Sequence, residues 1–384
     1  MEGEKKKKIN KITIGLTCLL AVAGLSVGIY FLTKKETPQT QTIQPPTTQP
    51  PEKTLSKYIY AIGDNDSGKD TLSIYDLETR ENGWENVVGS EMEMDRTYYR
   101  TSLVTAEDKK QYLYATSAII AVESEKYAIE KYSFDKKTWT KLDSFADMDR
   151  TQHVQSVMTV DGKQYIYAVG GVNRYSNEYS NTTTRFDPST NKWEPLSATM
   201  TYSRYGFQLC TYTDPNTGKQ FLYAVGGYSR DNGKTVILKS VEKYDPVQNV
   251  WTIVAPMNTP RGGHGAAIVT NNVNKTYMYA IGGLTGVESF SSLDTVERYD
   301  FDKNQWEKLS SKLNKPRIDF EAAVITESVG SPPIVSEYLY VFGGANQYET
   351  HNTVEKYLDE DRGWRIQDSM LMDKTRHTFS IAII

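Results

Sequence analysis

The feature that most constrains the fold of this chain is an internal repeat that recurs six times. Single tryptophans stand 54 to 58 residues apart, and about 25 residues before each lies a short, mostly tyrosine-rich run such as Tyr165–Gly171. Self-similarity at a fixed period is typical of repeat architectures, in which each unit buries its apolar face against the next. The tryptophans are Trp84, Trp139, Trp193, Trp251, Trp306 and Trp364.

Two further signatures stand at fixed places within the unit. Between the tyrosine-rich run and the tryptophan comes Val-Glu-Lys-Tyr-Asp at Val241–Asp245, with close copies at Val296–Asp300 and Val354–Tyr357. After the tryptophan an apolar residue precedes an arginine by four positions, as Met200 precedes Arg204. A unit of about 55 residues with four short strands has the size and strand number of one β-propeller blade. The sequence therefore predicts an all-β fold, a six-bladed β-propeller.

These residues resemble the Kelch repeat, in which a Gly-Gly pair ends the second strand and a Tyr-Asp and a tryptophan follow it. The resemblance covers residues 57–384, with six copies in register. Copies one and two depart from it, because Gly63-Asp64 and Ser117-Ala118 stand where the Gly-Gly pair is expected. We expect the glycines to adopt positive φ against neighbouring backbone and the tryptophans to pack between blades.

The two ends of the repeat region predict how the ring closes. The region begins with a second-type strand, Tyr58–Ile62, and finishes with Met372–Ile384, which matches the first strand of the other units. The last strand is therefore expected to complete the first blade, which leaves only short edges exposed.

The first 56 residues differ from the repeats in composition. Five lysines within residues 1–11 precede an uncharged apolar run, residues 12–33. As a helix at 1.5 Å per residue this run would be about 33 Å long, enough to cross a bilayer. The excess of lysines before this run predicts that residues 1–11 are cytoplasmic and that the repeat region, which we call the body, lies outside the cytoplasm. The alternative is a signal peptide cleaved near Ala23, which would leave the body secreted. Residues 34–56, rich in Pro, Thr and Gln, predict an extended linker.

Composition also bears on partners and cofactors. From Glu36 onward the net charge is about −9, which argues against nucleic acid as a partner. Cys18 and Cys210 are too few for a disulfide framework or a zinc site, and we expect no cofactor and no metal. Gly24 and Gly28 form a Gly-x-x-x-Gly pair in the apolar run, which permits a homodimer through that helix.

The candidate ligand-binding residues lie in segments that the topology brings to one end of the propeller. In an up-and-down blade, the start of strand one and the loop between strands two and three share an end. Loops 172–182 and 228–235 are rich in Tyr, Ser, Asn and Arg, as binding loops are. Arginines near the first strands are expected to line the mouth and bind a carboxylate-bearing ligand; the alternative is that they pair with acidic side chains of the chain itself. The candidates are Arg174, Tyr175, Tyr179, Arg204, Tyr228, Arg230, Arg261, Arg317, Tyr348 and Arg376.

The resemblance implies a binding module, because this face of Kelch propellers commonly binds partners. We expect a membrane-anchored, extracytoplasmic propeller that binds a protein or glycan and is not an enzyme, since no nucleophile elbow, phosphate loop or zinc-protease motif occurs. The alternative is an enzyme similar to the exported six-bladed Kelch sialic acid mutarotases, which use a glutamate and an arginine at the mouth for proton transfer. Glu178 and Arg174 are the nearest candidates for that pair.

Overall fold

The computed structural model describes residues 53–63, 72–80, 83–92, 100–116, 129–142, 150–173, 175–288, 290–376 and 379–384. The expected cytoplasmic tail, transmembrane run and most of the linker, residues 1–52, lie outside these ranges. Within them, no helix is long and apolar enough to span a membrane.

Six four-stranded antiparallel sheets make up the body, as the repeat predicts. Blade 1 comprises β28 (Ser380–Ile383), β1 (Tyr58–Ile62), β2 (Leu72–Asp76) and β3 (Trp84–Asn86). Blade 2 comprises β4 (Arg100–Thr105), β5 (Gln111–Thr116), β6 (Ile129–Ser133) and β7 (Thr138–Lys141). Blade 3 comprises β9 (Val154–Val160), β10 (Lys163–Val169), β12 (Thr182–Asp187) and β13 (Lys192–Thr199).

The remaining three blades follow the same order. Blade 4 comprises β14 (Gln208–Thr213), β15 (Gln220–Val225), β18 (Val241–Asp245) and β19 (Val250–Val254). Blade 5 comprises β20 (Gly265–Thr270), β21 (Thr276–Ile281), β22 (Val296–Asp300) and β23 (Gln305–Lys308). Blade 6 comprises β24 (Glu321–Val329), β25 (Ile334–Phe342), β26 (Val354–Tyr357) and β27 (Trp364–Ile366). Two small ribbons, β8 (Arg150–Thr151) with β11 (Val172–Asn173) and β16 (Tyr228–Asp231) with β17 (Lys234–Ile237), and a short 3-10 turn, η1 (Asp368–Met370), complete the fold.

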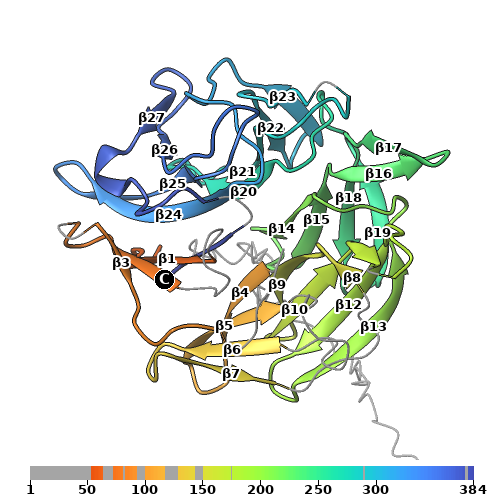
Figure 1. The fold of residues 1–384 in the computed structure, drawn as a ribbon, viewed down its shortest axis with the longest axis horizontal. Helices are drawn as coiled ribbons and strands as arrows, with labels where there is room; N and C mark the ends of the chain where they lie inside the picture. Colours follow the sequence, from red (N-terminus) through yellow and green to blue (C-terminus); the bar gives the residue numbers. More distant parts are fainter. Residues whose placement is uncertain are drawn as a thin grey trace, which may run out of the picture. The chain divides into compact units, whose positions relative to one another are not determined.

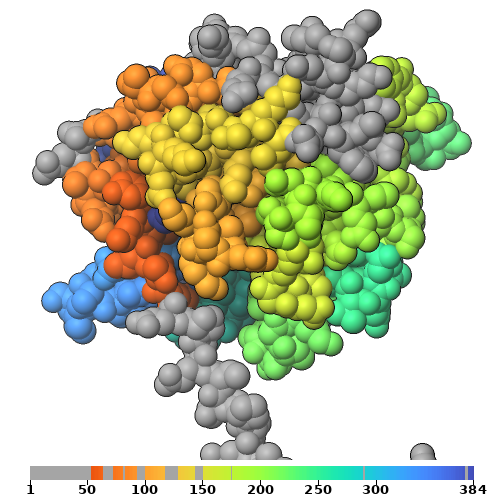
Figure 2. All heavy atoms as spheres, turned by 90° about the horizontal axis from the view of Figure 1, so that it is seen from below, coloured from red at the N-terminus to blue at the C-terminus, as the bar shows by residue number. Residues whose placement is uncertain are grey.

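The blades form a closed ring around the innermost strands (Figure 1). Each first strand contacts the first strand of the next blade, in the circular order β28, β4, β9, β14, β20 and β24. The starts of these strands and the loops between second and third strands lie at one end, which we call the loop face. The hairpin turns between first and second strands lie at the other end. The longest of these hairpins, β24–β25, projects from the body in light blue in Figure 2.

Ring closure follows the prediction. β28 pairs antiparallel with β1, with Ile383 opposite Ile59 and Ser380 opposite Ile62. The end of the expected linker also contacts the propeller, because the Ser56 amide donates to the Thr326 carbonyl at 3.0 Å and Lys53 Nζ donates to the Thr270 carbonyl at 2.8 Å. Residues 53–56 thus pass from blade 1 across blade 6 to blade 5.

The repeat residues hold neighbouring blades together. Gly226 and Gly227 have φ of +59° and +97°, and a Cβ on Gly226 would lie 2.5 Å from the Arg261 carbonyl oxygen of the next blade's entry. Trp251 of blade 4 is buried against blade 3 and donates its Nε1 hydrogen to Thr183 Oγ1 at 2.9 Å. Both expected structural roles are confirmed, and the hydrophobic core consists of these contacts between blades.

Candidate functional site

The four predicted mouth arginines are buried, so the expected arginine-lined mouth is wrong. Arg204, Arg261, Arg317 and Arg376 each have 0% exposed surface. The first three pair with the glutamate of the Val-Glu-(Lys/Arg)-Tyr signature in their own blade, Glu242, Glu297 and Glu355. Arg376 instead contacts Asp373 at 3.2 Å. The alternative, pairing within the chain, is confirmed.

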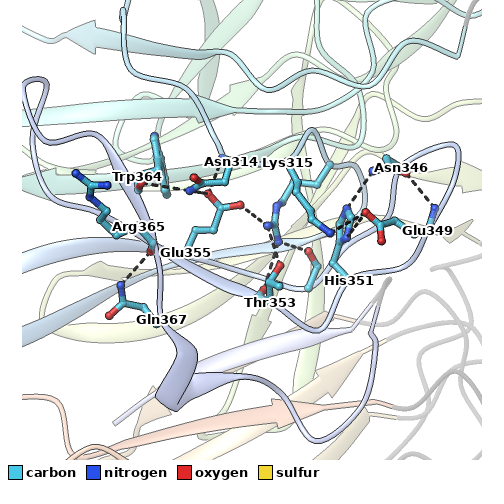
Figure 3. Close-up of polar contacts among 12 residues, drawn as sticks. Asn314, Lys315, Asn346, Glu349, His351, Thr353, Glu355, Trp364, Arg365 and Gln367 are labelled. Carbon is cyan, nitrogen blue, oxygen red and sulfur yellow. Dashed lines mark hydrogen bonds and ion pairs between the residues drawn. The ribbon is translucent and has the colours of Figure 1, made fainter.

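These ion pairs fix the segments that lead into each first strand. In blade 6, Glu355 bonds Arg317 and accepts hydrogen bonds at 2.8 Å from the backbone amide and the side-chain amide of Asn314 (Figure 3). Burial lowers the pKa of Arg317, and the charge of Glu355 opposes that effect. A guanidinium that is buried and bonded in this way is structural, because a ligand would have to displace an internal carboxylate to reach it.

Three other predicted residues come together on blades 3 and 4. The ring of Tyr179 meets that of Tyr205 edge-on at a centroid distance of 4.6 Å, and Tyr205 stacks on Tyr228 at 5.0 Å. The Arg230 guanidinium lies 4.6 Å from the centroid of Tyr179. We call Tyr179, Tyr205, Tyr228 and Arg230 the aromatic stack. Burial alone would raise the pKa of the Tyr179 hydroxyl, but hydrogen bonds with Thr235, Tyr205 and Arg230 lower it.

Glycines of blades 4 and 5 hold Tyr228 in place. A Cβ on Gly206 would lie 2.8 Å from the Tyr228 ring, and one on Gly262 would lie 2.5 Å from it. The ring therefore rests directly on both backbones, which a larger residue at either position would prevent. Its position is set by the fold before any ligand arrives.

Two members of the aromatic stack, Tyr205 and Tyr228, line a cavity of about 460 Å³ at the loop face, which we call the mouth cavity. Its residues come from blades 2 to 6, so it lies where the first strands converge. The lining includes both polar and apolar residues, and Phe290 among the apolar ones is 65% exposed. The polar lining includes Arg100, Gln152, His153, Thr235 and Asp319, and the apolar lining includes Leu284, Val287 and Phe290.

Three non-glycine residues around this cavity have a left-handed backbone. Gln152 and Asp319, at φ of +54° and +51°, occupy the position two residues after the buried arginine, where blades 4 and 5 have Gly206 and Gly263. Phe290 has φ of +45°, a conformation that bulky residues rarely adopt. Such conformations cost about 1–3 kcal/mol each and concentrate at functional sites.

An ion pair lies beside the mouth cavity, between blades 2 and 6. Arg100 Nη1 is 3.2 Å from Glu321 Oε1, and both residues line a smaller cavity of about 30 Å³ that shares Arg100, Gly206 and Asp319 with the mouth cavity. Burial raises the pKa of Glu321 to about 7, although the charge of Arg100 opposes that rise. A carboxyl group with this pKa can both donate and accept a proton near neutral pH.

The other predicted candidates are dispersed. Arg174 lies outside the described residues. Tyr175 and Tyr348 are 60% and 86% exposed on the loops of blades 3 and 6, and Glu178 is exposed on the loop of blade 3. Among the ranges that the structure covers, no group of His, Cys, Asp or Glu has the geometry to hold a metal ion.

Sequence reasoning missed Tyr205, Arg100 and Asp319. An alignment of the repeats would have identified them. Tyr205 directly follows the arginine of blade 4, and Asp319 replaces a glycine of the sister blades. Arg100 is the residue four after Arg96, at the position of Gln208 and Glu321. A comparison of the six units column by column would have placed all three at the mouth.

Comparison with known proteins agrees with this architecture. The Attractin/LZTR1 beta-propeller family model matches residues 58–274 and, in an overlapping match, residues 166–383. Kelch-like protein 15 of Danio rerio is 25% identical over 277 residues, which are 66% of this chain and 41% of that protein. A RING finger domain and kelch repeat-containing protein of Dictyostelium discoideum is 29% identical over 181 residues, which are 47% of this chain and 16% of that protein.

The chain spans less than half the length of these curated relatives. The solved structure of YjhT superposes with a TM-score of 0.55 at 15% identity, over 83% of this chain and 99% of that one, and shows a similar fold. The six sheets, the closing strand and the repeat residues agree with these matches. The chain therefore belongs to the Attractin/LZTR1 β-propeller family, and its body is a six-bladed Kelch-repeat propeller.

Proposed function

We propose that the propeller is a protein-interaction module that binds its partner at the mouth cavity. Kelch propellers are typically interaction modules, and the match to Kelch-like proteins supports the same role for this one. Interface residues that carry most of the binding energy are commonly Tyr, Trp and Arg in water-excluded pockets. The mouth cavity has two tyrosines, an exposed phenylalanine and an arginine around a space that is large enough for one or two partner side chains.

The observation that carries the proposal is the preorganised aromatic lining. Tyr228 is held on Gly206 and Gly262, and Phe290, with a left-handed backbone and a 65% exposed ring, lines the same cavity. Rigid aromatic groups lose little conformational entropy on binding, so more of their burial energy appears as affinity. An exposed phenylalanine in a strained conformation costs stability, which binding a partner would offset.

Selection from a random peptide library on the full-length chain tests the proposal. Peptides that bind the parent should lose at least 10-fold in affinity with Phe290→Ala and with Gly262→Ala, which displaces Tyr228 without removing it. Val329→Ser, at the tip of the β24–β25 hairpin and 44% exposed, is the control and should bind as the parent does. Equal loss in the control, or no loss in either cavity variant, would refute binding at the mouth. A glycan array in parallel covers the glycan alternative.

A second candidate function, of the sialic acid mutarotase type, is favoured by the pair Arg100–Glu321. Mutarotation needs a group that removes a proton from the anomeric hydroxyl and returns one to the ring oxygen, and Glu321, with a pKa of about 7, suits both steps. Exchange between sialic acid anomers, followed by NMR, should then be faster with the parent than with Glu321→Gln. Equal rates would remove this candidate and leave the binding proposal unaffected.

We also propose that the body is presented outside the cytoplasm on a membrane anchor, residues 12–33, with a dimer contact at Gly24 and Gly28. The support is the length of the uncharged run and the excess of lysines before it. The full chain should stay with membranes in alkaline carbonate, and added protease should reach the body in intact cells. Release by carbonate would favour the secreted alternative. Reduced crosslinking of Gly24→Ile with Gly28→Ile would support the dimer.

A further inference from the structure

Blade 3 differs from blades 4, 5 and 6 at one buried position. In the sister blades the residue opposite Ala224, Ala280 or Val341 of the second strand is a glutamate that pairs with the buried arginine. In blade 3 the same register position, opposite Ala168, is Thr184. The arginine is retained as Arg150, which is only 5% exposed.

The hydrogen-bond partners of Arg150 within the described residues are all neutral oxygens. Nη2 donates to the Ala168 carbonyl and to Thr184 Oγ1, both at 2.8 Å. Nη1 donates to the Thr182 carbonyl at 2.9 Å, to Thr182 Oγ1 and to Ser180 Oγ at 3.3 Å. Within the described ranges no carboxylate lies within ion-pair distance of this guanidinium, and burial lowers its pKa to about 10. Blade 1 also lacks the glutamate, but Asp373 supplies a carboxylate to Arg376 there.

The two hydroxyl groups over Arg150 face the loop side of blade 3. Thr182 is exposed and Ser180 is partly exposed, so solvent reaches this rim even though the guanidinium beneath it is buried. Ser180 Oγ and Thr182 Oγ1 lie 2.8 Å apart and both accept from Arg150. One hydroxyl proton serves the bond between them, and the other proton is free to donate outward. Hydroxyl groups that accept from a cation are polarised donors, and such a pair suits a negatively charged oxygen.

We propose that Arg150, Ser180 and Thr182 form a binding site for a small carboxylate anion. The anion accepts from a rim hydroxyl, draws the guanidinium toward the surface and supplies the charge that Glu242, Glu297 and Glu355 supply in the sister blades. A buried cation whose partners in the described part of the chain are all neutral is costly, so the anion stabilises the folded state. The site is on the loop face but is separate from the mouth cavity, and it does not depend on the proposed function.

Acetate is the probe, and the free energy of unfolding of the full-length chain in urea is the measurement. A ligand at 100 times its dissociation constant raises that free energy by about 2.7 kcal/mol. The unfolding midpoint of the parent should rise as acetate increases from 10 to 500 mM, with sodium chloride added to hold the ionic strength. Thr184→Glu, which restores the internal carboxylate, should show little response to acetate. Thr184→Gln, of similar size but neutral, should respond as the parent does.

A variant of the two hydroxyl residues at the rim, Ser180 and Thr182, provides an independent test if Thr184→Glu does not fold. Ser180→Ala with Thr182→Val removes the outward donors and leaves Arg150 in place, so this variant should lose the acetate response. An equal response in the parent, Thr184→Glu and the rim variant would show a general salt effect and overturn the proposal. No response in the parent would show that neutral oxygens satisfy Arg150 alone. A parent response to chloride equal to that to acetate would overturn the preference for carboxylate.

Discussion

The pair Arg100–Glu321 predicts how the stability of the fold changes with pH, and the burial of Glu321 sets both the direction and the size of that change. Burial raises the pKa of Glu321 from 4.5 to about 7, so the folded state binds more protons than the unfolded state between these values. Stability from this group is therefore full below pH 4.5 and is lost as the pH rises through about 7. With about 1.4 kcal/mol per pKa unit, a rise from pH 5.5 to 7.5 should cost about 2 kcal/mol.

His264 opposes this trend and must be separated from it. Burial lowers its pKa from 6.5 to about 3, so the unfolded state takes up the proton first and stability rises with pH over the same interval, by about 1.4 kcal/mol. These two contributions therefore nearly cancel between pH 5.5 and 7.5. The difference in unfolding free energy between the parent and Glu321→Gln isolates the carboxyl group, because His264 and the other groups contribute equally to both proteins.

Urea denaturation followed by tryptophan fluorescence at pH 5.5, 6.5 and 7.5 measures that difference. We expect the parent to lose about 2 kcal/mol relative to Glu321→Gln as the pH rises from 5.5 to 7.5. A difference that stays constant would show that Glu321 keeps an ordinary pKa. A difference that grows in favour of the parent at higher pH would show that attraction to Arg100 outweighs burial, and would refute the reasoning.

Three other expectations concern the propeller itself. His264→Phe should raise the urea midpoint, most of all at pH 5.5. The sister blades have Phe207 and Phe320 at this position, and neither ring nitrogen of His264 has a hydrogen-bond partner in the described part of the chain. An unchanged midpoint at pH 5.5 would contradict the burial of His264 as a neutral ring. Glu242→Thr should lower the free energy of unfolding by about 3–5 kcal/mol, because it leaves Arg204 buried without its partner. As the control, Glu307→Thr breaks a pair in which Glu307 is 55% exposed and should cost less than about 1 kcal/mol. Similar losses in both variants would mean that burial does not decide the cost. Removal of residues 379–384 should abolish the cooperative thermal transition seen by circular dichroism, because it removes β28 from blade 1; a retained transition would show that the ring tolerates an open blade.

The features that the sequence could predict are those that recur at the same place in each repeat unit. The strands, the Gly-Gly conformations, the tryptophan contacts and the pairing of β28 with β1 all depend on patterns that recur from unit to unit, and all are found. The direction of the arginine side chains could not be read in this way. Their spacing is the same whether they point to solvent or into the blade, and only their acidic partners, the third-strand glutamates or Asp373, decide between the two.

The candidate site was harder to predict because it depends on departures from the repeat. Asp319, Gln152 and Thr184 matter where they differ from the sister blades, and each difference involves one residue. Tyr179, Tyr228 and Arg230 were found from loop composition alone. Their contact with Tyr205 required the structure, because it joins loops of two blades.

The pairing of β28 with β1 also has a consequence for the order of folding. Tyr60 lies opposite Ala382, about 320 residues later in the chain, whereas the other blades pair strands that are close in sequence. The entropy of closing such a long loop grows only slowly with its length, but the search for the contact delays folding. Blades 2 to 6 can therefore assemble from local hairpins while blade 1 waits as three strands with one open edge. An intermediate of this kind should be the species most prone to pair with another chain, and a chaperone that recognises exposed edges would protect the protein at this step.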